Sequence, residues 1–219
     1  MPPPHRDLSS RKLRRRRLPL SVLGLLGVAL LALGVMLFRF HDTLTRQQTD
    51  RRAPSFAAAG DLPMPSVSTC FTPAQVCVDL IVDILDHAQS EIRLQAYGFS
   101  SSPVLSALVS AKRRGVDVAV ILDKSDDRAS SGRNDSGAEF VSRAGIFVFI
   151  DYRPAIAHNK VIVVDRHIVV TGSYNFTTAA ERRNAENITV LDSPEVARHF
   201  LANWESRRLV SRVFVKGDH

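Results

Sequence analysis

The fold of this chain is constrained most by residues 158–176, which read HNKVIVVDRHIVVTGSYNF. Two runs of branched apolar residues, VIVV and IVV, flank a short polar break, and this pattern is typical of a β-hairpin. Because neither strand shows a polar face, we expect the hairpin inside a largely buried sheet. Polar side chains nevertheless stand at both ends of the segment, and they require a separate explanation.

Strand-like and helix-like segments alternate around this hairpin, which predicts an α/β sandwich around a largely buried sheet. No internal repeat is visible. A polar loop at 124–136 is longer than most connections, and it either lines a substrate groove with Arg128 and Arg133 or is simply solvated. The other predicted elements are helices at 73–88, 103–114, 137–143 and from Ser193-Pro194 onward, with strands at 91–98, 116–123, 146–151 and 187–191.

The first 60 residues differ from the rest in charge and hydropathy. They hold 11 Lys and Arg against 3 Asp and Glu, whereas residues 61–219 hold 18 against 19, so the basic charge does not belong to the folded domain. Residues 18–38 carry no charge, and as a helix they would span about 31 Å, the thickness of a hydrocarbon core. We therefore predict a basic cytoplasmic tail at 1–17, a transmembrane signal anchor at 18–40, a linker at 41–64 and a catalytic domain at 65–219.

Six cations at residues 11–17 precede the apolar run. Cations in this position predict that the tail stays in the cytoplasm and that the domain lies on the periplasmic or extracellular side. A cleaved signal peptide would instead release the domain as a secreted protein, although no small-residue cleavage site directly follows the run. An organelle transit peptide, and with it a mitochondrial membrane, is the third interpretation.

Cys70 and Cys77 are the two cysteines of the chain. Thr72 and Pro73 resemble the N-cap and first residue of a helix, which would place Cys77 in its second turn. A disulfide would suit the oxidising compartment that the topology predicts, and two free buried thiols are the alternative. A metal site is not expected, because no pair of histidines lies nearby.

The polar ends of the hairpin segment are predicted to converge. Strand alternation puts His158 and Lys160 on one face, about 7 Å apart. A turn at 165–168 pairs residues whose numbers sum to 333, so that Lys160 lies opposite Ser173 and His158 lies opposite Asn175. A loop of three residues would break this register.

A cation and two neutral donors beside an imidazole suit an anionic tetrahedral group. Such donors lower the barrier to attack on a phosphodiester, and a neutral imidazole can attack phosphorus as a covalent nucleophile. Gly172 is expected to leave room for a ligand beside the backbone. A divalent metal is disfavoured because Lys160 would repel it, and residues 172–175 do not form a serine-hydrolase elbow. The sequence therefore predicts a metal-independent phosphodiesterase.

The same residues resemble the HKD signature of the phospholipase D superfamily, complete at every position: His158-x-Lys160-x4-Asp165-x6-Gly172-Ser173-x-Asn175. The similarity extends over roughly residues 65–210 and includes CFTPAQVC, IRLQAYGFSS, AKRRGVDVAVILD and GSYNFTTAAERRNAENITV. These stretches resemble the short, single-motif bacterial endonucleases and the mitochondrial cardiolipin hydrolase group. The resemblance implies an α/β/α sandwich around a mixed sheet, with no cofactor.

The resemblance also implies a role for each motif residue. His158 would form a phosphohistidine, Lys160 and Asn175 would hold the phosphate oxygens, and Ser173 would assist. Glu186 stands where the family has a carboxylate that orients the histidine. Because Asp165 falls at the turn, on the opposite strand face, we expect it to have only a supporting part in catalysis.

A phosphohistidine mechanism needs a second group to protonate the leaving oxygen. Larger family members carry two HKD motifs, whereas this chain has one. His87, His167 and His199 lack the H-x-K context and are predicted to be surface residues. We therefore expect a symmetric homodimer that brings two copies of His158 together.

Three functions remain open at the level of sequence. A nonspecific endonuclease on DNA or RNA is favoured by the resemblance, with Arg182-Arg183 and Lys112-Arg113-Arg114 as nucleic-acid patches or as ordinary solvated faces. A phospholipase D acting on phosphatidylcholine or cardiolipin is favoured by the predicted anchor. A tethered nucleic-acid-binding module without turnover is the third, and the intact histidine argues against it.

Overall fold

The structure is a computed structural model that describes residues 33–37, 39, 66–129 and 136–215. The predicted tail, the linker and most of the predicted anchor lie outside these residues. Within the described ranges, no helix is both long enough and apolar enough to cross a membrane. The chain divides into two units, Met1–Leu62 and Pro63–His219, and the second holds the sheet described below.

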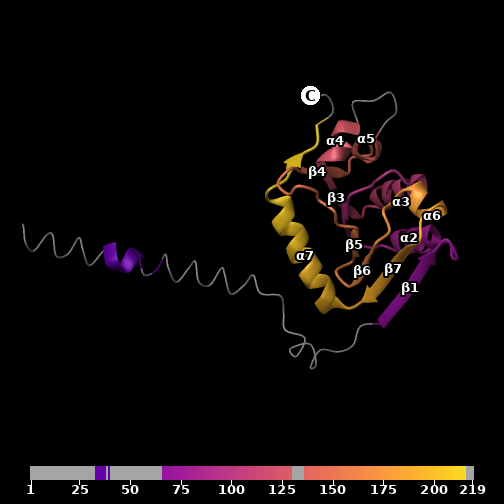
Figure 1. The fold of residues 1–219 in the computed structure, drawn as a ribbon, viewed down its shortest axis with the longest axis horizontal. Helices are drawn as coiled ribbons and strands as arrows, with labels where there is room; N and C mark the ends of the chain where they lie inside the picture. The colour runs from indigo at the N-terminus through magenta and orange to yellow at the C-terminus, as the bar shows by residue number, and fades with distance from the viewer. Residues whose placement is uncertain (1–32, 38, 40–65, 130–135, 216–219) are drawn as a thin grey trace, which may run out of the picture. The chain divides into compact units, whose positions relative to one another are not determined.

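Eight strands of the described residues form one mixed sheet in the order β1-β7-β6-β5-β2-β3-β4-β8 (Figure 1). The central strands β2, β3 and β4 run parallel, and every other neighbouring pair is antiparallel. The predicted α/β fold around a mixed sheet is confirmed. The strands are β1 Ser66–Thr72, β2 Glu91–Ala96, β3 Asp117–Asp123, β4 Phe147–Asp151, β5 Val161–Val164, β6 Ile168–Gly172, β7 Glu186–Asp192 and β8 Arg212–Val213.

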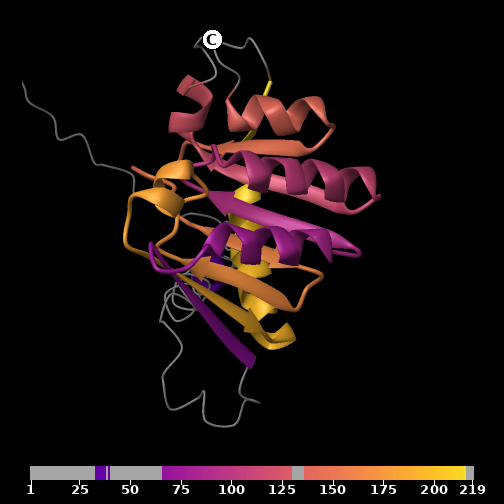
Figure 2. The same cartoon turned by 90° about the vertical axis from the view of Figure 1, so that its right-hand side faces the viewer.

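Helices cover both faces of this sheet (Figure 2). The main core lies between the sheet and α2, α3 and α5, where Ile81, Leu108 and Ile162 are fully buried. The last helix, α7, covers the opposite face and buries Trp204. The helices are α2 Cys77–Asp86, α3 Ser102–Arg113, α4 Lys124–Ala129, α5 Gly137–Arg143, α6 Thr178–Arg182 and α7 Pro194–Arg208.

The hairpin of β5 and β6 is present, but its predicted register is wrong. Val161 pairs with Thr171 and Val164 pairs with Ile168, so that paired numbers sum to 332. The loop therefore has three residues, and its first two, Asp165 (φ 49°) and Arg166 (φ 64°), are left-handed. Consecutive left-handed residues match the twist of a hairpin, and aspartate tolerates this conformation.

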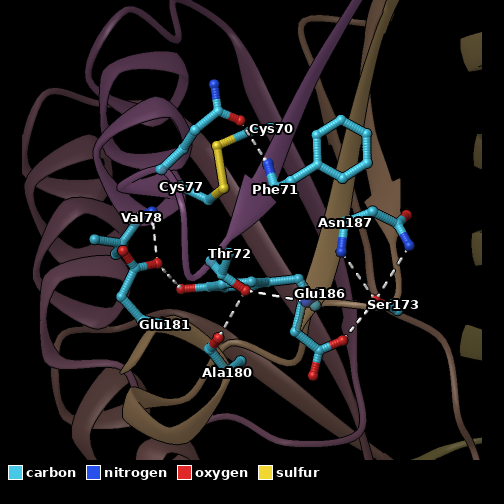
Figure 3. The surroundings of a disulfide bond; sticks show 12 residues. Cys70, Phe71, Thr72, Cys77, Val78, Ser173, Ala180, Glu181, Glu186 and Asn187 are labelled. Atoms are coloured by element: carbon cyan, nitrogen blue, oxygen red, sulfur yellow. Dashed lines mark hydrogen bonds between the residues drawn. A yellow bond between two sulfur atoms is a disulfide. The ribbon is translucent and has the colours of Figure 1, made fainter. Parts of the chain in front are cut away.

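The domain begins with a strand and not with the predicted helix at 73–88. Thr72 is the last residue of β1 and pairs with Glu186 of β7, so it is not a helix N-cap. Helix α2 starts only at Cys77. Cys70 of β1 and Cys77 form a disulfide, with a Cα–Cα distance of 5.7 Å, and both residues are buried (Figure 3). The disulfide therefore joins the edge strand to the first turn of α2.

Candidate active site

Five of the six polar residues predicted for the site lie at the same end of neighbouring strands in the sheet. His158 and Lys160 precede β5, Ser173 and Asn175 follow β6, and Glu186 begins β7. Because β5, β6 and β7 are successive antiparallel neighbours, the start of β5, the end of β6 and the start of β7 meet. The end of β2 joins them, since β2 is antiparallel to β5.

Lys160 is a nearly buried cation, with 8% of its surface exposed. Its Nζ donates a hydrogen bond to the carbonyl of His158 (3.0 Å) and lies 5.4 Å from the ring centre of Tyr97. Burial lowers the pKa of Lys160, and the negative charge of Glu186 partly opposes this shift. The site thus holds an ammonium group that water solvates poorly and that an anionic ligand would stabilise.

The His158 side chain is exposed and packs on the ring of Tyr97, with ring centroids 4.7 Å apart and an interplanar angle of 63°. Within the described part of the chain, neither imidazole nitrogen has a hydrogen-bond partner. The resemblance led us to expect that Glu186 orients this ring, but in the described residues the carboxylate of Glu186 binds elsewhere. The imidazole is therefore open to a substrate.

Glu186 is the acceptor in a hydrogen-bond network with Ser173 (Figure 3). The Ser173 hydroxyl donates to Glu186 Oε2 (2.5 Å), and Asn184 Nδ2 donates to Glu186 Oε1 (2.8 Å). The backbone N–H of Asn187 donates to Ser173 Oγ (3.1 Å). The Ser173 proton is thus directed at a carboxylate, so this residue would have to turn before it could donate to a phosphate.

The network is anchored to the disulfide-linked segment through Thr72. The backbone N–H of Glu186 donates to Thr72 Oγ1 (3.1 Å), and the Thr72 hydroxyl lies within donating distance of the carbonyls of Ala180 (3.2 Å) and Asn184 (3.0 Å). Nearby, the Tyr174 hydroxyl and the N–H of Val78 both donate to the Glu181 carboxylate. Strand β1 therefore contacts Glu186 directly, and helix α2 contacts Glu181 in the segment just before it.

Asn175 lies against the backbone at Gly98, just after β2. A Cβ atom at residue 98 would lie 3.3 Å from the Asn175 Cβ and 2.9 Å from Thr177 Cγ2. Among the described residues, the buried Asn175 Oδ1 has no hydrogen-bond partner. This oxygen is an acceptor, so it is the Nδ2 amide group of Asn175 that could donate to a phosphate.

Gly172 was expected to leave room for a ligand, but the neighbouring strand occupies this space. A Cβ atom at this position would lie 2.2 Å from the carbonyl oxygen of Asn187 in the neighbouring strand. The glycine is thus required because two backbones approach closely.

Asp165, the remaining motif residue, lies at the far end of β5. Five residues separate it from Lys160, which corresponds to about 16 Å along a strand. Its carboxylate accepts hydrogen bonds from the backbone N–H groups of Gln89 (2.8 Å), Ser90 (2.7 Å) and Glu91 (3.0 Å). Burial alone would raise the pKa of Asp165, but these hydrogen bonds outweigh it and hold the pKa below its usual range. The structure therefore gives Asp165 a place in the fold and not at the site.

The basic residues that the sequence suggested for nucleic-acid binding lie at opposite ends of the strands. Arg182 and Arg183 are exposed around the end of α6, a short helix that begins two residues after Phe176. The 112–114 cluster ends α3, which leads to the start of β3 at the opposite edge, and Arg114 donates to the carbonyl of Leu85 (2.8 Å). The side chains of Arg128 and Arg133 lie outside the described residues. His87, His167 and His199 each bind an aspartate or glutamate side chain at the surface.

Tyr97 and Gly98 belong to the site, but the sequence had not singled them out. They follow directly after β2, and the fact that this strand ends next to the hairpin could have indicated that they belong to the site. In the described ranges, no group of three or more His, Cys, Asp and Glu side chains could hold a metal ion.

Comparison with known proteins identifies similar chains. A family model described as "Cardiolipin synthase, PLD-like domain" matches residues 81–208. A phospholipase D of Rickettsia felis is 39% identical over 191 residues, covering 86% of this chain and 94% of the relative. The mitochondrial cardiolipin hydrolase of Mus musculus is 34% identical over 149 residues, covering 68% of this chain and 66% of that one. The crystal structure of Nuc from Salmonella typhimurium, a phospholipase D family member, is 37% identical with a TM-score of 0.63, covering 68% of this chain and 98% of that chain.

Proposed function

We propose, from the premise that this chain belongs to the phospholipase D superfamily, that His158 is its nucleophile and forms a phosphohistidine. The chain is a phosphodiester hydrolase, as its family match and its relatives indicate. The identity of the nucleophile, the assembly and the substrate are the parts that we propose.

The arrangement of His158, Lys160 and Asn175 supports this proposal most strongly. A neutral imidazole attacks phosphorus, the ester oxygen leaves, and water then hydrolyses the phosphohistidine. Meanwhile the Lys160 ammonium offsets the negative charge that develops on the non-bridging oxygens, and the Asn175 amide N–H donates a hydrogen bond to them. Neither step in this scheme draws on a metal ion.

The departing oxygen still needs a proton donor. His87, His167 and His199, the other histidines of the described residues, already bind carboxylates at the surface. We therefore propose that a second copy of His158 supplies the proton in a symmetric homodimer. Sedimentation of the full-length chain in detergent, with activity measured across the same fractions, checks this. Activity confined to a monomer would contradict the dimer.

We propose nucleic acid as the substrate. The nucleophile is exposed, and Arg182 and Arg183 are exposed residues at the end of α6, a helix that begins three residues after Asn175. Within the described part of the chain, neither guanidinium forms an ion pair, so both are available to phosphates that flank the cleaved bond. The resemblance to short endonucleases supports the same substrate.

Phospholipid is the second candidate substrate. It is favoured by the names of the relatives, phospholipase D and mitochondrial cardiolipin hydrolase, and by the apolar run at 18–38. We propose that residues 18–40 anchor the chain and hold the domain on the non-cytoplasmic side, where a disulfide is stable. Carbonate extraction and a protease-protection assay on spheroplasts check this topology, and cleavage of the domain only after the spheroplasts are lysed would contradict it.

Activity assays of the full-length chain in EDTA separate these proposals. Plasmid DNA and vesicles of phosphatidylcholine or cardiolipin serve as parallel substrates. His158→Ala should abolish cleavage, whereas His87→Ala, which changes an exposed histidine at the opposite edge, should leave it intact. Plasmid nicking supports the endonuclease, and headgroup release without nicking supports the phospholipase. Full activity of His158→Ala would overturn the mechanism for either substrate.

A further inference from the structure

Tyr97 connects the two central groups of the site. It is the first residue after β2, and its ring contacts the imidazole of His158 (centroids 4.7 Å apart) while the ammonium of Lys160 lies over it (5.4 Å). In the described ranges, no other side chain has a recorded ring or cation contact with both groups.

The imidazole depends on this contact for its orientation. Because neither nitrogen of His158 has a hydrogen-bond partner in the described part of the chain, the ring of Tyr97 is the recorded neighbour that limits its rotation. Edge-to-face packing of two rings prefers a defined angle, so it restrains the plane in which the nucleophilic nitrogen lies. A nucleophile gains much of its rate from such alignment.

The same ring lies beside the ammonium group of Lys160 and helps to stabilise its charged form. Lys160 is nearly buried, and burial lowers its pKa. The face of an aromatic ring attracts a cation, so Tyr97 stabilises the charged form that a phosphate-binding lysine requires. One of the three N–H donors of Lys160 binds the carbonyl of His158, which leaves two for substrate oxygens.

The residue after Tyr97 extends this contact surface to the third group. Gly98 lies against Asn175 so closely that a Cβ atom at position 98 would press on its side chain at 3.3 Å. The end of β2 therefore touches the nucleophile, the cation and the amide through two consecutive residues.

We infer that Tyr97 is a positioning residue, whose ring sets the orientation of His158 and holds the ammonium of Lys160 at a fixed place beside it. This inference rests on the proposed roles of His158 and Lys160. The ring, and not the hydroxyl, is the active part, because the Tyr97 hydroxyl has no hydrogen-bond partner among the described residues.

Variants at this position of the full-length chain give a defined expectation. Tyr97→Leu should lower kcat by about a hundredfold, the scale on which small misplacements of reacting groups act. In Tyr97→Leu, the pH above which kcat/KM falls should also be lower, because Lys160 loses a neighbour that stabilises its charged form and so gives up its proton more readily. Tyr97→Phe keeps the ring and should restore both kcat and the pH limit. The control Tyr152→Leu removes a tyrosine that contacts a different cation, Arg212, and should change neither.

A second pair of variants removes any doubt about folding. Phenylalanine and 3,4,5-trifluorophenylalanine at position 97 have nearly the same shape, but fluorine withdraws the negative charge from the ring face. The fluorinated protein should lose activity at lower pH than the phenylalanine protein, with the same melting temperature.

The outcomes separate this inference from the proposed function. Full activity of His158→Ala would refute the proposed function itself. Loss of activity in His158→Ala, together with unchanged kcat, KM and pH limit in Tyr97→Leu and in the fluorinated protein, would overturn the role of Tyr97 alone.

Discussion

Replacement of Asp165 by asparagine tests whether this motif residue stabilises the fold or takes part in the chemistry. Its Oδ1 accepts hydrogen bonds from the N–H groups of Ser90 and Glu91 and from the Ser90 hydroxyl, and its Oδ2 accepts from the N–H of Gln89. Asparagine also tolerates the left-handed backbone of Asp165 (φ 49°), so the substitution changes the hydrogen bonds and not the loop. One N–H group, that of Gln89, then faces a donor.

The expected loss follows from that single mismatch. A hydrogen bond to a charged acceptor contributes about 1.5–3 kcal/mol, so Asp165→Asn should lower the free energy of unfolding by about 2 kcal/mol. For a domain of this size, such a loss lowers the melting temperature by about 4–8 °C. Because the pKa of Asp165 is lowered from 3.8, its contribution is present above that pH and is lost as the pH falls through the native value. The difference between wild type and variant should therefore shrink in acid.

Thermal melts and kinetics on the same preparations decide the question. At a temperature well below both melting transitions, kcat should be unchanged, because Asp165 lies at the far end of β5. Asp192→Asn serves as the control, because among the described residues this exposed carboxylate binds the exposed ring of His167, and its replacement should cost little stability. A collapse of kcat with an unshifted melting temperature would refute the structural role.

Two further predictions concern stability. Joint replacement of Cys70 and Cys77 by alanine should lower the free energy of unfolding by about 2.5 kcal/mol, the chain-entropy estimate for the short loop that the disulfide closes. In urea melts, dithiothreitol should therefore destabilise the wild type and leave the variant unchanged. Equal stability of the oxidised wild type and the variant would contradict this prediction. Burial and the nearby Asp123 raise the pKa of Asp126 from 3.8 to about 7, so the stability held by its protonated form is complete below pH 3.8 and is lost as the pH rises through 7. Asp126→Asn should remove this decline, which amounts to at most about 4 kcal/mol, and parallel stability curves for the two proteins between pH 4 and 8 would disprove it.

The interior of the domain could be predicted because its apolar periodicity is strong. The strands β2, β3, β4 and β7, the hairpin, and the helices α3, α5 and α7 all occur close to their expected positions. Strand β1 was missed because five of its seven residues are exposed, which gives it no apolar pattern. Helices α4 and α6 and strand β8 were missed as well, and at six, five and two residues they are too short to carry a periodic signal.

The candidate site was predicted in its residues but not in its geometry. The motif named His158, Lys160, Ser173 and Asn175, and the family resemblance added Glu186; the structure gathers these residues at one end of the strands. The register differed by one, because two left-handed residues in a row cannot be read from Asp-Arg-His. Tyr97 was missed for a different reason: its importance lies in contacts with residues about 60 positions later in the chain, which local sequence does not contain.

The three-residue connection between β5 and β6 has a consequence for how this part of the chain can diverge. A single inserted or deleted residue there would shift the pairing of β5 with β6 by one position and turn one of the two strands over, while leaving both strands intact. Homologous enzymes should therefore vary in the amino acids of this connection but keep its length of three residues. Length polymorphism at that tip among active homologues would mean that the pairing can be re-established in some other way.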